Sequence, residues 1–557
     1  MKRSHQTDSV ATTVTQASEV PKPSVVRAWL KESSEPEPAL RAQRVEAILE
    51  KVRLAALPTD VRFRSTEICR QELASAGPDP DKSLAGLSLP LHPDKEKLFR
   101  KCAQSYWSLA ACYMRVAADL ASTRDAVHKD ATYLLCSCYW GINSLAEHLL
   151  TNYEHYAKVR PGVWLDIHKF YNMAHSEGVQ DTPVSPDQPS QTVEHLYKRV
   201  LLLGLSDPYR YPFRSLAKIY AQLDDWAAFA SLTTVSADPG RCVFIVDPAL
   251  DRAATPALAN SRIRPAFNEK WLITREMVDR LKLQHERAAK KAASLEDKPE
   301  SMAREMAREM EPLELLRRVI VSWGLHPVRN STRTRTYRPC DVVTGLKSVC
   351  VALNQFRPLR VELAGAEPSF LQVLKGAGGE RTGSDSLEGI VRHWEIADES
   401  ERGLRMTVGG DQFAGGMSVG ELIAVRAGRS GEWRIGYVHW AQTDHDNKLS
   451  LGLRMLRAGA EPVLIGRLGA DRPPDAARSP ALLLVSESAD RRTLSLLCDK
   501  SLYLPMGTYL VHRPHARDER VMEATSVLLS TRSFVWFEAC KPQAATKQRT
   551  LDLLYPY

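Results

Sequence analysis

A short polar turn at residues 398–403 carries the side chains best suited to chemistry in this sequence. It reads Asp-Glu-Ser-Glu-Arg-Gly and lies between two apolar, strand-like runs at 389–396 and 404–408. Asp and Ser bend a chain by hydrogen bonding to their own backbone, and glycine supplies a position with positive φ. The turn leaves a carboxylate and a hydroxyl at the rim of a sheet, where the carboxylate can accept two hydrogen bonds from the N–H edge of a guanine.

An arginine-rich segment upstream supplies the opposite charge. Residues 328–338 contain four arginines and no acidic residue. Guanidinium groups form two-pronged hydrogen bonds with phosphates and stack on flat bases. The two segments together predict a site for an anionic guanine nucleotide, with arginines for phosphates and ring faces and with Asp398 and Ser400 for base edges.

The order of these motifs resembles that of PilZ domains, the bacterial receptors for cyclic di-GMP. The resemblance rests on Arg329-x-x-x-Arg333, on Asp398-x-Ser400-x-x-Gly403, and on strand-like runs at 419–426, 433–440 and 449–456. Either short motif alone arises by chance in long chains, whereas the ordered set is much more specific. The resemblance covers residues 325–457 and implies a β-barrel that binds cyclic di-GMP.

The resemblance also implies roles for individual residues. Arg329 and Arg333 would contact phosphates and stack on or bond to guanine. Asp398 and Ser400 would hold the guanine edge, and Gly403 would permit a close backbone approach. Further arginines are candidates for auxiliary contacts with the ligand, namely Arg335, Arg338 and Arg402.

An insertion-like segment at 345–387 separates the two motifs. It contains an apolar run at 349–353 and a glycine-rich stretch at 376–379. Binding requires the arginines to fold back across this segment onto the turn. The alternative is that 398–403 is only a hairpin turn and 329–338 a solvated basic linker.

Composition places the chain among ordinary globular proteins with several domains. It has 557 residues, 44% hydrophobic and 25% charged residues, and a net charge of +8 at pH 7. This length favours three or four folding units. The basic excess permits an anionic partner but does not argue for one, because acidic and basic residues are interspersed.

Cysteine usage and hydropathy indicate a cytoplasmic protein. The ten cysteines include no C-x-x-C pair and have no ligand-spaced histidines beside them, so we expect reduced thiols, no metal and no cofactor. The N-terminus lacks the apolar core of a signal peptide. No apolar run reaches the roughly 18–20 residues that a membrane-spanning helix needs.

The fold class that we predict is multidomain α+β. The N-terminal segment predicted to be disordered contains one apolar island at 25–30, which would dock on a partner or pack against the chain itself. A run at 241–247 reads as a single strand covering the helices. The predicted order is a disordered segment at 1–39, an all-α bundle or repeat-like domain at 40–300, a connecting helix at 301–328, a PilZ-like barrel at 329–457 and a second small β domain at 458–557.

The functional prediction is a receptor rather than an enzyme, because no phosphate loop, zinc motif, nucleophile elbow or carboxylate pair is present. Ligand would order a hinge of arginines and re-orient the helical domain, which would act on a protein partner. By resemblance, the process would be motility, surface attachment or exopolysaccharide production. A scaffold with degenerate barrels that acts through protein contacts alone is the alternative, and nucleic-acid binding is the weakest reading.

Overall fold

The computed structural model describes most of the chain, with gaps. The described residues are 20–31, 38–76, 89–122, 127–235, 237–258, 269–294, 300–324, 332–354, 391–409, 417–428, 431–456, 459–468, 478–488, 491–505, 507–514, 516 and 518–542. They belong to two compact units. The helical unit comprises Met1–Ser83, Asp94–Thr151 and Gly162–Tyr197, and the barrel unit comprises Leu84–Pro93, Asn152–Pro161 and Lys198–Tyr557. The expected boundaries at 300 and 328 fall inside the barrel unit.

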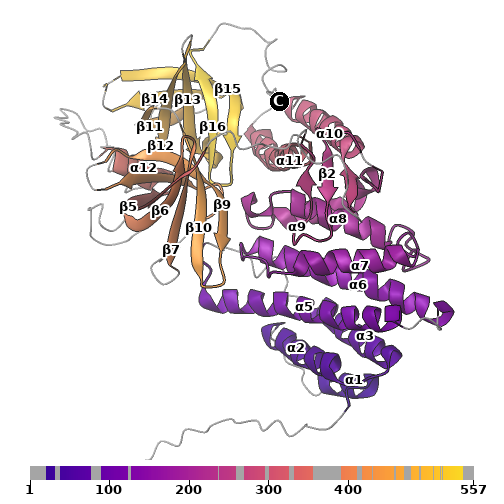
Figure 1. The fold of residues 1–557 in the computed structure, drawn as a ribbon. Coiled ribbons are helices and arrows are strands. Elements are labelled where there is room, and N and C mark those ends of the chain that lie inside the picture. Colours follow the sequence, from indigo (N-terminus) through magenta and orange to yellow (C-terminus); the bar gives the residue numbers. More distant parts are fainter. Residues whose placement is uncertain are drawn as a thin grey trace, which may run out of the picture. The chain divides into compact units, whose positions relative to one another are not determined.

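The helical unit is built from amphipathic helices. The longest two, α5 and α6, bury their apolar stripes, which include Cys112 and Val116 on α5 and Ile142 and Leu149 on α6. Gly141 lets α6 pack closely on α7, because an added Cβ would lie 2.3 Å from the Phe170 ring. Figure 1 shows α5, α6 and α7 running alongside one another. The helices are α1 (Pro23–Lys31), α2 (Pro38–Leu54), α3 (Thr59–Ala76), α5 (Pro93–Ser122), all but the end of α6 (Val127–Glu154), α7 (Val163–Ser176) and the first part of α8 (Val193–Leu205).

Helix α1 corrects the expectation of disorder for residues 23–31. Its buried residues, Val26 and Trp29, belong to the predicted apolar island. The Ser65 hydroxyl on α3 donates a hydrogen bond to the Pro21 carbonyl, with 3.0 Å between the oxygens, and Lys51 lies 4.5 Å from the centre of the Trp29 ring. The island therefore packs against its own chain. The rest of the segment predicted to be disordered lies outside the described residues, apart from residues 20–22 and the start of α2.

The first part of the barrel unit combines helices with a small sheet. The antiparallel sheet has the order β1-β4-β2-β3. The run at 241–247 thus contributes to a sheet of four strands rather than forming the single strand that was expected. The elements are η1 (Pro208–Arg210), α9 (Ser215–Trp226), η2 (Ala227–Phe229), β1 (Ser231–Thr233), β2 (Val243–Val246), β3 (Thr255–Pro256), β4 (Lys270–Ile273), α10 (Arg275–Ser294) and α11 (Glu300–Gly324).

The first β-barrel carries the motifs singled out above. It is closed, with the strand order β10-β7-β6-β5-β8-β9. Closure removes the unpaired edges of the sheet and makes neighbours of strands that are far apart in sequence. Its strands are β5 (Thr334–Thr344), β6 (Arg392–Ser400), β7 (Gly403–Gly409), β8 (Leu422–Ala427), β9 (Arg434–Thr443) and β10 (Lys448–Met455).

The predicted C-terminal β region forms a second closed barrel, with the order β11-β12-β13-β16-β15-β14. Alternating apolar residues fill its interior, including Val463, Tyr509 and Phe537. Its elements are β11 (Gly459–Leu468), β12 (Ser479–Ser488), β13 (Arg491–Asp499), η5 (Lys500–Leu502), β14 (Thr508–Arg513), β15 (Asp518–Ser530) and β16 (Phe534–Cys540).

One apolar core joins the two barrels, which are orange and yellow in Figure 1. Leu422 and Ile435 come from the first barrel, and Leu484 and Phe534 come from the second. Helix α12 (Leu346–Asn354), which begins the insertion, adds Val349, Cys350 and Ala352 to the same core. The apolar run of the insertion is therefore a buried helix, while its glycine-rich stretch lies outside the described residues. Among the helices that the structure describes, none combines the length and hydropathy needed to span a bilayer.

Candidate functional site

The turn at 398–403 is the tip of the β6–β7 hairpin, as the sequence predicts. Ser400 pairs with Gly403 across the hairpin, so Glu401 and Arg402 form a two-residue connection. The Ser400 hydroxyl donates a hydrogen bond to the Gly403 carbonyl, with 3.2 Å between the oxygens. Ser400 therefore stabilises the hairpin, and its predicted contact with a base would come in addition to this bond.

Asp398 is a buried carboxylate held by two arginines from neighbouring strands. The residue is 7% exposed. Arg333, just before β5, donates a hydrogen bond from Nη1 to Oδ1 at 2.9 Å, and the Nε of Arg405 on β7 lies 2.7 Å from Oδ2. A buried carboxylate needs such partners, because the loss of its hydration costs several kcal/mol. Removing one partner of a buried ion pair typically destabilises a protein by ~3–5 kcal/mol.

Glu399 forms a second ion-pair cluster beside the first. It contacts Arg338 on β5 and the Nη1 of Arg434 on β9. Each of the two carboxylates thus meets two guanidinium groups, an excess of one positive charge in each cluster. Such an excess favours an anionic ligand, since phosphate oxygens accept charge-assisted hydrogen bonds from arginine.

The structure brings together some of the predicted residues and leaves others apart. Arg333 reaches Asp398 although 65 positions separate them, so the insertion does not keep the two motifs from meeting. Arg338 pairs with Glu399, the residue that follows Asp398 in the sequence. Arg335 and Arg402 are exposed near the hairpin, Arg335 directly opposite Asp398 in the β5–β6 ladder. Arg329 lies outside the described residues.

Irregular strand pairing surrounds Asp398. The register shifts between Arg335 and Arg338 in the β5–β6 ladder, and between Ile396 and Asp398 in the β6–β7 ladder. Extra residues in a ladder bend the strand and re-aim its side chains. Tyr337 lies within the first shift with a φ of 43°, which an aromatic residue rarely adopts, and it is 59% exposed. The Tyr337 side chain is therefore exposed to solvent, and in the sequence it lies between Arg335 and Arg338.

Gly403 does not have the conformation that was predicted for the glycine of the turn. It does not adopt positive φ. An added Cβ would instead lie 2.8 Å from the carbonyl oxygen of Leu453 on β10. The close backbone approach that glycine permits here is therefore between β7 and a neighbouring strand. A ligand-binding role for Gly403 stays a prediction.

Sequence reasoning missed Arg405, Arg434 and Tyr337. A signal for Arg405 was present, because counting outward from the two-residue turn pairs Ser400 with Gly403 and Asp398 with Arg405. Arg434 gave no local signal, since β9 meets this rim only through barrel closure. Tyr337 stands out only through its backbone conformation.

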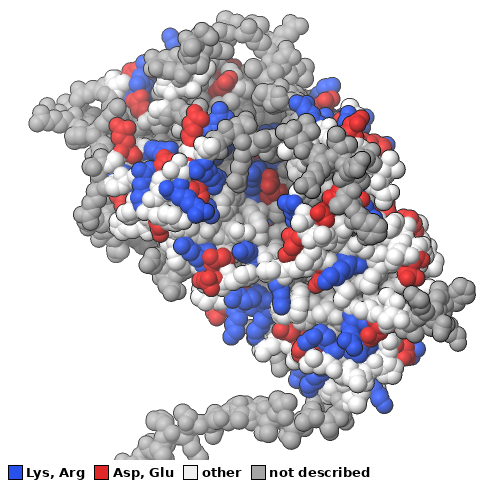
Figure 2. Space-filling model, viewed as in Figure 1, with Lys and Arg blue, Asp and Glu red and all other residues white. Residues whose placement is uncertain are grey.

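The distribution of charged side chains and of possible metal ligands limits the classes of ligand that the protein can bind. On the face shown in Figure 2, Lys and Arg side chains are interspersed with Asp and Glu rather than gathered into one basic surface. This pattern does not favour a long polyanion such as duplex nucleic acid. Over the described part of the chain, no group of three or more His, Cys, Asp or Glu side chains could hold a metal ion.

Comparisons with known proteins give one family match and one curated relative. Residues 24–238 match the family of the N-terminal domain of the cyclic-di-GMP receptor FimW. The cyclic-di-GMP receptor FimW of Pseudomonas aeruginosa is 23% identical to this chain over 324 residues, which is 56% of this chain and 51% of that protein. The chain thus spans about half the length of the curated relative it matches. The family match does not include the Asp398 hairpin.

We predict that Gly403→Ala destabilises the first barrel, because its Cβ would lie 2.8 Å from the Leu453 carbonyl oxygen. The expected loss in the free energy of unfolding is about 1–3 kcal/mol. Urea unfolding followed by tryptophan fluorescence would measure it. Gly409→Ala is the matched control on the same strand, since a Cβ there meets nothing within 4 Å. Equal unfolding midpoints for the two variants would contradict this account of Gly403.

Proposed function

We propose that this chain is a bacterial receptor for cyclic di-GMP and that the dinucleotide binds at the Asp398 hairpin of the first barrel. The observation that carries the proposal is the convergence of Arg333 on Asp398 across 65 positions, from two motifs in the order found in PilZ domains. The similarity to a cyclic-di-GMP receptor supports the ligand independently, because its family match lies in a different part of the chain.

Each group at the hairpin has a role in this proposal. Asp398 has two carboxylate oxygens with about four acceptor sites, so it can bind the N–H edge of guanine while it keeps its contacts to arginine. Arg333 and Arg338 would donate to phosphates, and Arg329, Arg335 and Arg402 would add to the positive field. The exposed ring of Tyr337 would stack on a guanine face.

The chain acts as a receptor rather than an enzyme in this proposal. The charged groups at the hairpin are held in ion pairs, which suits recognition of a charged ligand. The curated relative is named a receptor. The output would pass to a protein partner through the helical unit, which holds most of the family match, in motility, surface attachment or exopolysaccharide production.

The scaffold alternative also has an observation in its favour. Both carboxylates at the hairpin are fully paired without any ligand, so the ion pairs could serve the barrel alone. Ligand binding and its loss in site variants separate the two functions.

We predict that calorimetric titration with cyclic di-GMP gives binding by the full chain, weakened at least about tenfold in Arg333→Ala and in Asp398→Asn, since each change removes a charge-assisted hydrogen bond. Asp398→Asn keeps the side-chain shape, and circular dichroism would check its fold. Arg520→Ala is the control, because Arg520 is exposed on the second barrel and pairs with Asp518. No heat with wild-type protein, or equal weakening by Arg520→Ala, would favour the scaffold.

We predict a separate contribution from Tyr337. Base stacking on an aromatic ring is worth about 1–3 kcal/mol by alanine substitution, so Tyr337→Ala would raise the Kd by about 5- to 150-fold. Tyr337→Phe keeps the ring and would bind like wild type. Calorimetry of both variants is the measurement. A Kd for Tyr337→Ala equal to that of wild type would remove the stacking role.

We predict that the ligand changes the shape of the full chain, because ordering of the arginine segment would re-orient the helical unit. Small-angle scattering with and without saturating cyclic di-GMP would detect a change in the radius of gyration. Arg333→Ala should show no change at the same ligand concentration. An unchanged scattering curve in wild-type protein that binds by calorimetry would rule out this mechanism while leaving the binding site in place.

A further inference from the structure

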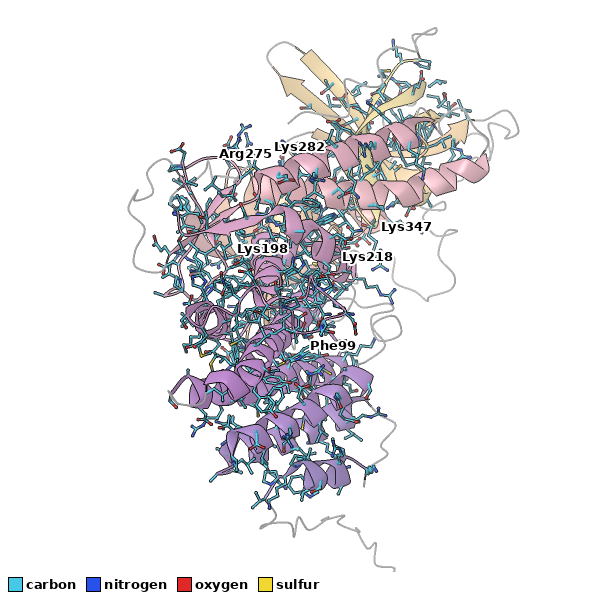
Figure 3. All side chains as sticks on the ribbon, turned by 90° about the vertical axis from the view of Figure 1, so that its right-hand side faces the viewer. Phe99, Lys198, Lys218, Arg275, Lys282 and Lys347 are labelled. Carbon is cyan, nitrogen blue, oxygen red and sulfur yellow. The ribbon has the colours of Figure 1, made fainter. Side chains whose placement is uncertain are left out.

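A second cationic site lies in the barrel unit and shares no residue with the Asp398 hairpin cluster. It is a cavity of about 240 Å³. Its walls come from the start of α9, from α11, and from both barrels. Lys218, labelled in Figure 3, lies on α9 and lines the cavity. The cavity therefore joins three parts of the barrel unit that are distant in sequence.

Positive charge dominates the lining of this cavity. Five basic side chains face one carboxylate, that of Glu314 on α11. Glu314 already has two cationic partners, at 2.8 Å from Arg317 and 3.0 Å from Arg318. Burial alone would raise the pKa of Glu314, but these ion pairs outweigh it and hold the pKa below its usual value. The basic residues are Arg214, Lys218, Arg318, Lys500 and Arg532.

His439 on β9 adds a neutral hydrogen-bonding group to the cavity. Burial, followed by the charges of Arg210, Arg454 and Arg318, lowers its pKa to about 3. The imidazole is therefore uncharged at physiological pH and can donate one hydrogen bond and accept another. Because nearby arginines contribute to this lowered pKa, the pKa also indicates a positive potential around His439.

The N-terminus of α9 is already capped and is not the source of the site. Glu154 accepts hydrogen bonds from the backbone nitrogens of Arg214 and Ala217, each at 2.6 Å. Its charge offsets that of Arg214. The basic groups of the cavity outside this cap include Lys500 and Arg532 of the second barrel.

The two barrels meet tightly at the wall of the cavity. Gly420 has a φ of +89°, and an added Cβ would lie 3.2 Å from the Cβ of Thr531. The Ser533 hydroxyl donates a hydrogen bond to the Gly420 carbonyl at 3.4 Å. Lys500 and Arg532 of the second barrel thus line the same cavity as residues 437–439 of the first.

We propose that this cavity binds a small phosphorylated molecule. Converging ammonium and guanidinium groups suit a phosphate dianion, because they supply charge-assisted hydrogen bonds to several of its oxygens. The volume lies below the roughly 300–1,000 Å³ of pockets for drug-sized ligands, so the cavity suits one phosphate on a small organic group rather than a cyclic dinucleotide. Binding there would stabilise the packing of α11 and both barrels. The proposal does not depend on the function of the Asp398 hairpin.

Thermal unfolding and calorimetry with ribose 5-phosphate would test this site in the full chain, with ribose as the control that lacks the phosphate. We expect ribose 5-phosphate to bind and to raise the Tm, and ribose to do neither. Lys500→Gln and Arg532→Gln should each weaken binding at least about tenfold. Lys448→Gln, an exposed residue on β10, is the matched control and should bind like wild type.

Asp398→Asn should also bind ribose 5-phosphate like wild type, so failure at this cavity and failure at the hairpin are distinguishable. Absence of binding by wild-type protein would overturn the proposal. So would equal binding by the Lys500→Gln/Arg532→Gln double variant, or an equal Tm shift with sodium chloride at the same ionic strength, which would mean unspecific screening.

Discussion

A carboxylate placed inside a protein must be met by cations and hydrogen-bond donors, and Asp398 is met by two arginines. One arginine precedes β5 and the other lies on β7, so the carboxylate ties together the strands on either side of β6. The register shifts on both ladders lie next to it. The ligand proposed for this rim would meet a charged group whose position is fixed in advance, which would lower the entropic cost of binding.

Local patterns predicted much of this site, and barrel closure decided the rest. The polar turn and its flanking strands followed from alternation and turn chemistry at residues 389–408. The partner of Glu399 on β9 could not follow from any local pattern, because β9 reaches the rim only when the sheet closes. The bulge at Tyr337 was equally hidden, since no residue type there demands a left-handed backbone.

In the helical region too, local patterns predicted some elements, whereas elements that depend on distant contacts were missed. The long helices α5 and α6 carry periodic apolar stripes and lie within the all-α domain predicted at 40–300. Helix α1 was misread because its surroundings are polar and rich in Pro and Ser, while the surface that orders it lies on other helices. The sheet β1-β4-β2-β3 was missed because its strands are two to four residues long and are stabilised by partners distant in sequence.

The apolar core common to both barrels makes them one folding unit with two sequence segments. Leu422 and Ile435 from one barrel pack in the same layer as Leu484 and Phe534 from the other, with α12 alongside. Cutting the chain near residue 458, where the sequence suggests a boundary, would leave each barrel's share of that layer on the surface of its fragment. Large exposed apolar patches promote aggregation, so truncated versions carrying a single barrel would be poor material for biochemistry. Transfer of one barrel into another protein would expose the same residues, unless new side chains covered them.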